Sequence, residues 1–116
     1  MFWLLGATTT LMGFFGTPAF ADTVTFPQYC SCVSYVRQYI PSVPHVDAWV
    51  FPTFPRSAPA VGEVAMFNYS GIFHVAYISQ IRGEGFEIQE ANFHSCQKGT
   101  RFISWDDPHL VGFWKP

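Results

Sequence analysis

The chain has 116 residues, of which 49% are hydrophobic and 12% are charged, and its formal net charge is -2. This length suits one domain, and the composition excludes a disordered chain. The six basic residues are scattered and form no basic run, so we expect no nucleic-acid partner.

The first 21 residues differ from the rest of the chain because they contain no charged side chain. Small residues, Ala19 and Ala21, stand three and one positions before Asp22, as signal peptidase requires. We interpret residues 1–21 as a cleaved secretory signal, with an uncleaved membrane anchor as the alternative, and residues 22–116 as the mature domain. The prediction is a secreted or periplasmic monomer, which contacts a membrane only if the first segment is retained.

A helix is predicted for Ser31–Ile40. Val33 and Val36 recur at helical spacing, Ser31 is a suitable capping residue, and Pro41 ends the segment. The helix is therefore expected to bury one face against the core.

The stretch from residue 41 to residue 62 contains five prolines, which exclude long helices. We expect an irregular wall with one short helical turn at Val46–Val50. Its aromatic residues, Trp49, Phe51 and Phe54, are candidates for substrate contact, although packing in the core is the more common role of such side chains.

Beyond Gly62 the sequence changes to short strand-like runs separated by turns, which indicates consecutive antiparallel strands. The predicted strands are Glu63–Phe67, Phe73–Ile81, Phe86–Glu90, Arg101–Trp105 and Leu110–Trp114. One helix packed on a curved antiparallel sheet gives an α+β fold. Alternation in the second strand places His74, Ala76 and Ile78 on one face, which we expect to meet the helix end.

The order of Cys32, His74 and Glu90 is that of a cysteine hydrolase. Cys32 lies in the first turn of the predicted helix, where unpaired backbone N–H groups favour a thiolate. His74 is a candidate general base, and Glu90 or Asn92 is a candidate for orienting its imidazole. Alternation puts Glu90 and Asn92 on the same strand face, so either can bond the ring; Glu90 is the first choice and Asn92 a supporting fourth member.

Five blocks of sequence resemble, in order, the CHAP domain, the cysteine, histidine-dependent amidohydrolase/peptidase of the NlpC/P60-related group. They are Cys32–Arg37, Val61–Ala65, His74–Ile78, Glu90–Phe93, and Arg101–Ile103 followed by Leu110–Phe113. The resemblance covers residues 29 to 114. It departs from many members at Phe73, which stands where they have glycine before the histidine, and at Cys30-Ser31, which stands where they have Gly-Gln.

The resemblance implies a papain-like fold and hydrolysis of an amide bond in peptidoglycan. The enzyme would be either an N-acetylmuramoyl-L-alanine amidase or a peptidoglycan endopeptidase. Cys32 would be the nucleophile, His74 the general base, and Glu90 with Asn92 the groups that orient it. This chemistry requires no cofactor and no metal, and peptidoglycan is the expected partner.

The remaining cysteines have structural interpretations. In an exported protein Cys30 and Cys96 are expected to pair, which leaves Cys32 as a free thiol. A zinc site formed by the three cysteines with His74 and His94 is an alternative, but Cys-x-Cys is shorter than the usual ligand spacing and zinc would consume the nucleophile.

Two further expectations concern side chains outside the cysteines. A second class of function is a non-catalytic module that binds the cell wall or a partner protein through Trp49 and Phe54. Arg101 is expected to be a structural ion-pair or hydrogen-bond partner rather than a substrate clamp.

Overall fold

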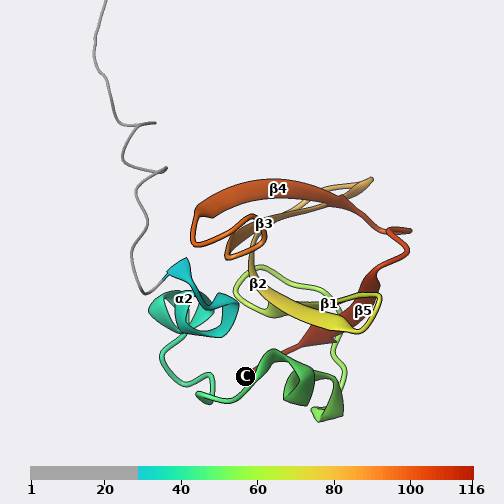
Figure 1. Ribbon diagram of the computed structural model, residues 1–116. Coiled ribbons are helices and arrows are strands. Elements are labelled where there is room, and N and C mark those ends of the chain that lie inside the picture. The colour runs from blue at the N-terminus through green and yellow to red at the C-terminus, as the bar shows by residue number, and fades with distance from the viewer. Residues whose placement is uncertain (1–28) are drawn as a thin grey trace, which may run out of the picture.

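The computed structural model describes residues 29–116, so the predicted signal or anchor segment lies outside the described residues (Figure 1). The elements are helix α2 (Cys32–Tyr39), the 3-10 helix η2 (Ala48–Thr53), and strands β1 (Val64–Tyr69), β2 (Ile72–Ile81), β3 (Gly85–Ala91), β4 (Lys98–Ser104) and β5 (Leu110–Trp114). Within this part of the chain, no helix is long and apolar enough to cross a membrane.

The bounds of α2 follow from its two ends. Ser31 has an extended backbone, with φ of -142°, and its hydroxyl accepts a hydrogen bond of 3.1 Å from the Ser34 N–H. This cap fixes the first turn at Cys32. At the other end the Ile40 N–H donates to the Val36 carbonyl, and Pro41 prevents a further turn. The predicted helix is confirmed to within one residue at each end.

The five strands form one antiparallel sheet in the order β4-β3-β2-β1-β5. Each predicted strand overlaps an observed one, with the largest difference at β4, which begins three residues earlier than predicted, and β1 to β4 pair with their neighbours in the chain as expected. The last strand does not pair with β4 but returns to the opposite edge, beside β1. The sheet is strongly curved, as Figure 1 shows, and α2 and η2 lie below β4 in that view.

Two groups of buried side chains occupy the two faces of the sheet. The first joins Val33 and Val36 of α2 to Phe51 of η2 and to Val64 and Val75 of the sheet. The second lies on the other face and is formed by strand residues only: Ala65, Phe67, Ala76, Ile78, Phe86, Ile88 and Ile103. The short helices therefore cover one face, while the curvature of the sheet encloses the other.

The predicted fold class, a papain-like α+β fold with an N-terminal helix packed on a curved antiparallel sheet, is wrong. The described residues form a small β-rich domain, in which eight residues of α2 and six of η2 accompany a five-stranded antiparallel sheet. The physical reason is that the sheet contributes to both buried groups and forms one of them alone, so the two short helices only cover one face. In residues 41–62 proline removes helical hydrogen bonds, so only one short 3-10 element forms before the sheet begins.

Part of the prediction for the faces of β2 also fails. His74 lies near the first residue of α2, as expected, because both residues line one hollow and Cys32 raises the pKa of the ring. His74, Ala76 and Ile78 do share one face, because Phe67, which pairs with His74, packs in the strand-only group with Ala76 and Ile78. Beyond His74 this face lies away from the helix, and it is Val75 that packs against the helix. The catalytic candidates thus meet at the edge of the helix contact rather than beneath the helix.

Gly85 provides a test of the β3–β4 pairing. A Cβ atom at this position would lie 2.0 Å from the Ile103 carbonyl oxygen, a backbone atom that cannot move without breaking the pairing. Gly85→Ala should lower the free energy of unfolding by about 3 kcal/mol. Urea unfolding followed by circular dichroism measures this loss.

The matched control is Gly99→Ala in the neighbouring strand, where an added Cβ meets no atom within 4 Å. This variant should unfold close to the wild-type midpoint. Equal midpoints for the two variants would show that the β3–β4 register is incorrect.

Candidate active site

The side chains of Cys32 and His74 lie close to each other. Cys32 is the first residue of α2 and is a half-buried free cysteine. His74 comes from β2 and is only 5% exposed. Both residues line one hollow, and the thiol is close enough to raise the pKa of the ring. The two residues that the sequence predicted as nucleophile and base are therefore brought together by α2 and β2.

Glu90 holds the other side of the imidazole. Its Oε1 atom lies 2.8 Å from Nε2 of His74, and its carboxylate is 3% exposed. Because Nε2 donates to this carboxylate, Nδ1 is the ring nitrogen that remains for the thiol. Glu90 thus stands in the orienting position predicted for it.

Arg101 holds Glu90 in turn. Its Nε atom donates to Oε2 of Glu90, its terminal nitrogen lies 3.1 Å from Oε1, and the same nitrogen donates to the Tyr69 hydroxyl at 3.0 Å. The guanidinium also lies 3.6 Å from the centre of the Phe93 ring. The prediction that Arg101 is an ion-pair partner is confirmed.

Sequence reasoning missed that the partner of Arg101 is the carboxylate of the candidate site. The feature that brings Arg101 and Glu90 together is the register of β3 and β4, in which Arg101 pairs with Ile88. Glu90 shares the face of Ile88, so it is the diagonal neighbour of Arg101 across the two strands. This register is a tertiary property that strand patterns alone do not give.

The contacts of the site shift the pKa values of its members. Burial lowers the pKa of His74, but hydrogen bonds and charge interactions with Cys32 and Glu90 outweigh it and raise the value from 6.5 to about 8. Burial raises the pKa of Glu90, and the hydrogen bonds and positive charges of His74 and Arg101 reverse this effect and lower it. At neutral pH the site therefore holds an imidazolium next to the sulfur and a carboxylate behind it.

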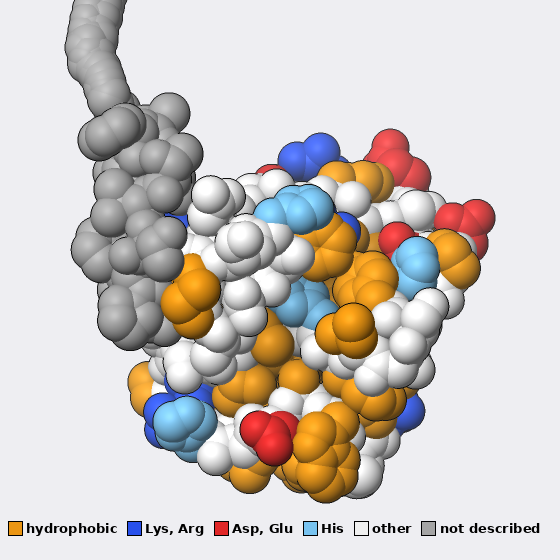
Figure 2. All heavy atoms as spheres, in the orientation of Figure 1, with side chains coloured by type: hydrophobic (Ala, Val, Ile, Leu, Met, Phe, Trp, Pro, Cys, Tyr) orange, Lys and Arg blue, Asp and Glu red, His pale blue; other side chains and the backbone are white. Residues whose placement is uncertain are grey.

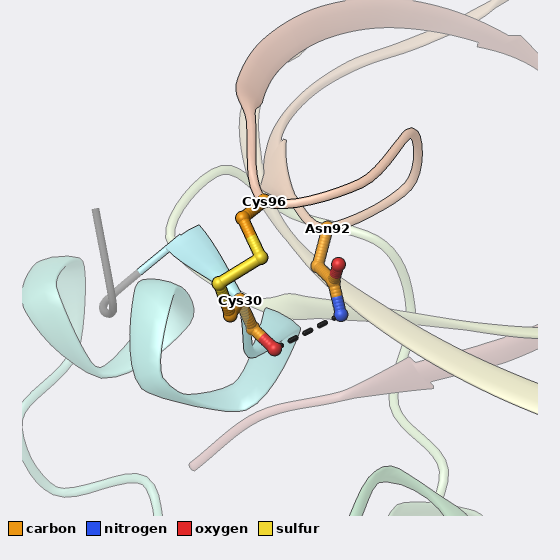
Figure 3. The surroundings of a disulfide bond; sticks show 3 residues. All are labelled: Cys30, Asn92 and Cys96. Atoms are coloured by element: carbon orange, nitrogen blue, oxygen red, sulfur yellow. Dashed lines mark hydrogen bonds between the residues drawn. A yellow bond between two sulfur atoms is a disulfide. The ribbon is translucent and has the colours of Figure 1, made fainter. Parts of the chain in front are cut away.

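Asn92 does not bond the imidazole as the fourth member of the set. Strand β3 ends at Ala91, and Asn92 has a left-handed backbone with φ of 62°, so the alternation that placed it beside Glu90 stops there. Its amide Nδ2 instead donates to the Cys30 carbonyl oxygen at 3.0 Å (Figure 3). Asn92 thus fixes the segment before Cys32.

A disulfide joins Cys30 to Cys96, as predicted, and leaves Cys32 free. Figure 3 shows that the bond links the start of α2 to the loop after β3, beside the hydrogen bond from Asn92. Disulfides of this kind are typical of proteins that fold outside a reducing cytoplasm. The bond also uses two of the three sulfurs of the alternative zinc set.

Cys32 and Asn92 line two hollows. One, of about 600 Å³, lies between the start of α2 and residues 45–50. The other, of about 260 Å³, is bordered mainly by aromatic and aliphatic side chains near His74. Figure 2 shows hydrophobic side chains gathered around a hollow on this face of the molecule.

The aromatic residues predicted to line a cleft divide between two roles. Phe51 is completely buried, and Phe54 packs against the same group and against Trp114. Trp49 is 60% exposed on η2. Two of the three are therefore core residues, and Trp49 alone is available for contact with another molecule.

Comparison with known proteins gives little similarity. No family model matches the chain. No curated protein matches it. Among solved structures, the crystal structure of Ly7917 is similar with a TM-score of 0.45 and 18% sequence identity over 52% of this chain. The match spans 29% of the Ly7917 chain, less than a third of its length, and likeness at this level assigns neither fold nor function.

Removing the disulfide should destabilise the fold strongly. The bond joins residues separated by 66 positions, and a closed loop of that length restricts the unfolded chain enough to contribute about 4 kcal/mol. The double variant Cys30→Ser with Cys96→Ser should therefore unfold at a much lower urea concentration. Cys32→Ser, which removes only the free thiol, is the control and should retain most of the stability. Equal midpoints for the double variant and the wild type would contradict the role given to the bond.

The pKa of His74 predicts how stability depends on pH. Since the folded value of about 8 exceeds the unfolded 6.5, the protonated ring stabilises the fold by about 2 kcal/mol below pH 6.5. This contribution should be lost as the pH rises through about 8. Glu90→Gln removes the negative charge and leaves Arg101 unneutralised, so it should lower the pKa of His74 by about 1 to 2 units.

NMR titration of the histidine side chains, with His74→Gln used for assignment, measures these values directly. Glu84→Gln, in the exposed turn between β2 and β3, is the control and should leave the titration unchanged. A wild-type His74 that titrates at or below 6.5 would show that the thiol and carboxylate contacts are absent in solution.

Proposed function

We propose that the protein is a cysteine amidohydrolase or peptidase that cleaves an amide bond of peptidoglycan. The observation that supports this most is the grouping of Cys32, His74 and Glu90, with Cys32 in the lining of two hollows. An isolated cysteine or histidine is usually structural, but a thiol beside an imidazole that is oriented by a buried carboxylate is the arrangement that nucleophilic catalysis needs.

The reactive form of Cys32 in this reaction is its thiolate, with the imidazolium of His74 beside it. The Cys32 sulfur attacks the carbonyl carbon of the scissile amide, and the carbonyl electrons move to the oxygen. His74 then gives its proton to the nitrogen as the carbon–nitrogen bond breaks, which releases the amine and leaves a thioester. The neutral His74 takes a proton from water, the hydroxide attacks the thioester, and the acid leaves as the Cys32 thiolate is restored.

The first turn of α2 provides the electrostatic support for this sequence. The N–H groups of Cys32 and Val33 precede the first intrahelical bond, which runs from Tyr35 N–H to the Ser31 carbonyl. They are suited to bind the negative oxygen of the tetrahedral intermediate, an effect commonly worth about 3 kcal/mol for each donor. Glu90 fixes the orientation of the His74 imidazole and stabilises its charge, and Arg101 keeps Glu90 ionised.

Two other observations support the proposed substrate and the proposed compartment. The resemblance of the sequence blocks to the CHAP domain favours peptidoglycan, with amidase and endopeptidase activity both compatible with the set. The disulfide favours a secreted or periplasmic protein. In this proposal the enzyme acts as a monomer on the wall and needs no cofactor.

The exposed Trp49 favours a second candidate function, a non-catalytic module that binds the wall or a partner. Thiol labelling distinguishes the two. In an enzyme, iodoacetamide should label Cys32 rapidly and with a pH dependence that His74→Ala changes, because the imidazolium activates the sulfur. Slow labelling that is insensitive to His74 would favour the binding module.

Cys32→Ala and His74→Ala should each abolish lysis of purified cell walls in zymography. The first removes the nucleophile, and the second removes the group that transfers the proton. Both losses should exceed that of Glu90→Gln, because an amide still accepts a hydrogen bond from the ring.

Circular dichroism and thermal unfolding of the same variants serve as the control for folding. Trp49→Ala should keep its hydrolytic chemistry on soluble fragments, since Trp49 does not belong to the bonded set. Clearing zones of wild-type size from folded Cys32→Ala would rule out the proposed reaction.

A further inference from the structure

The guanidinium of Arg101 lies over the ring of Phe93. Its central carbon is 3.6 Å from the centre of the ring. The nitrogens of the same guanidinium are hydrogen-bonded to Glu90 and to the Tyr69 hydroxyl. Phe93 adds to these bonds a contact with the negative face of an aromatic ring, which attracts a cation. The position of Arg101 therefore depends on the ring as well as on its hydrogen bonds.

The loop after β3 places Phe93 in this position. Immediately after the strand, Asn92 has φ of 62°, a left-handed conformation in which asparagine is enriched. The Asn92 N–H donates to the Gln97 carbonyl at 2.9 Å, which closes the loop, and the disulfide of Cys96 ties the loop to the start of α2. The backbone on both sides of Phe93 is thus fixed, so the ring is held over the guanidinium by more than its own packing.

Phe93 lines two hollows of the molecule. The first is the one that contains Cys32 and His74, and the ring centre of Phe93 lies 5.7 Å from that of the imidazole. The second, of about 180 Å³, contains Glu90 and Arg101. No other described residue lines both. Phe93 is therefore next to the proposed catalytic pair and also next to the ion pair behind it, where an apolar ring strengthens the attraction between the two charges.

We propose that Phe93 is a positioning residue of the candidate site, whose ring keeps the guanidinium of Arg101 against the carboxylate of Glu90. The inference rests on the proposed function and adds to it a residue that acts through Arg101 rather than on the substrate. Without the ring, hydrogen bonds alone hold the guanidinium, and it leaves Glu90 more often. Glu90 then loses part of the positive charge that keeps it ionised, and the ionised carboxylate is what orients His74.

The expected sign follows from the charges that face Glu90. Burial raises the pKa of Glu90, and the hydrogen bonds and positive charges of His74 and Arg101 outweigh burial and lower it. Since His74 stays protonated below its pKa of about 8, a rise in the pKa of Glu90 in a Phe93 variant reports on Arg101. The other titratable side chains nearby line the two hollows or bond Arg101: Cys32, Tyr69, His94 and Lys98.

The test compares Phe93→Leu with Phe93→Tyr in the full chain. Leucine keeps an apolar side chain but has no ring face for a cation, whereas tyrosine keeps that face. In Phe93→Leu the Glu90 carboxyl should titrate about half a unit higher by carbon-13 NMR, with Glu90→Gln used for assignment, and the Nε proton of Arg101 should exchange with water about threefold faster. The acid limb of the rate of wall lysis should rise by the same amount. Phe93→Tyr should keep all three wild-type values.

Phe102→Leu is the matched control, because Phe102 also lies near a guanidinium, that of Arg82 at 5.6 Å, but lines neither hollow. It should leave Glu90 and Arg101 unchanged. Wild-type NMR values in folded Phe93→Leu would overturn the inference, because a ring used only for packing or for substrate contact does not alter the titration of the free protein. Equal changes in Phe93→Leu and Phe93→Tyr would overturn it as well.

Circular dichroism of each variant shows whether it is folded. The NMR values do not require hydrolysis, so they test the role of Phe93 separately from the reaction. Wild-type protein that lyses no wall, together with the expected change in Phe93→Leu, would overturn the proposed function and support the positioning of Arg101 by Phe93.

Discussion

The buried carboxylate of Glu90 is the group on which the arrangement of the site depends. It is 3% exposed and contacts a guanidinium on one side and an imidazole on the other. A buried carboxylate without such partners would take up a proton, because burial penalises the charged form. Arg101 therefore keeps Glu90 ionised, and the ionised Glu90 keeps His74 protonated beside the sulfur. Each group in this series depends on the one before it.

The fold brings this series together from four separate elements. Strands β3 and β4 supply Glu90 and Arg101 through their register, β2 supplies His74, and the capped first turn of α2 supplies Cys32. The disulfide and the amide of Asn92 fix the start of α2 to the loop after β3. The contact between the start of α2 and the loop after β3 is the only one of these connections that lies outside the sheet and the helix. The disulfide between Cys30 and Cys96 strengthens this contact.

The sequence was informative where local chemistry decides structure. The caps and breaks at Ser31 and Pro41 predicted α2, and alternating patterns with turns predicted all five strands. The expectations failed where distant parts of the chain decide. The pairing of β5 with β1, the meeting of Arg101 with Glu90, and the left-handed turn at Asn92 all depend on tertiary packing. The predicted fold class was wrong for a similar reason, because short local motifs do not determine the architecture of the whole domain.

The three cysteines of the chain show how one short segment holds sulfur in two chemical states. Cys30 and Cys32 are separated by one residue, but Cys30 precedes the helix and faces the loop of Cys96, whereas Cys32 begins the helix and lies close to His74. Once Cys30 and Cys96 are joined, the chain contains no further cysteine with which Cys32 can pair. The disulfide therefore does more than stabilise the loop, because it leaves Cys32, the proposed nucleophile, as the one thiol of the chain. A compartment that oxidises thiols is in this way compatible with catalysis by a free sulfur.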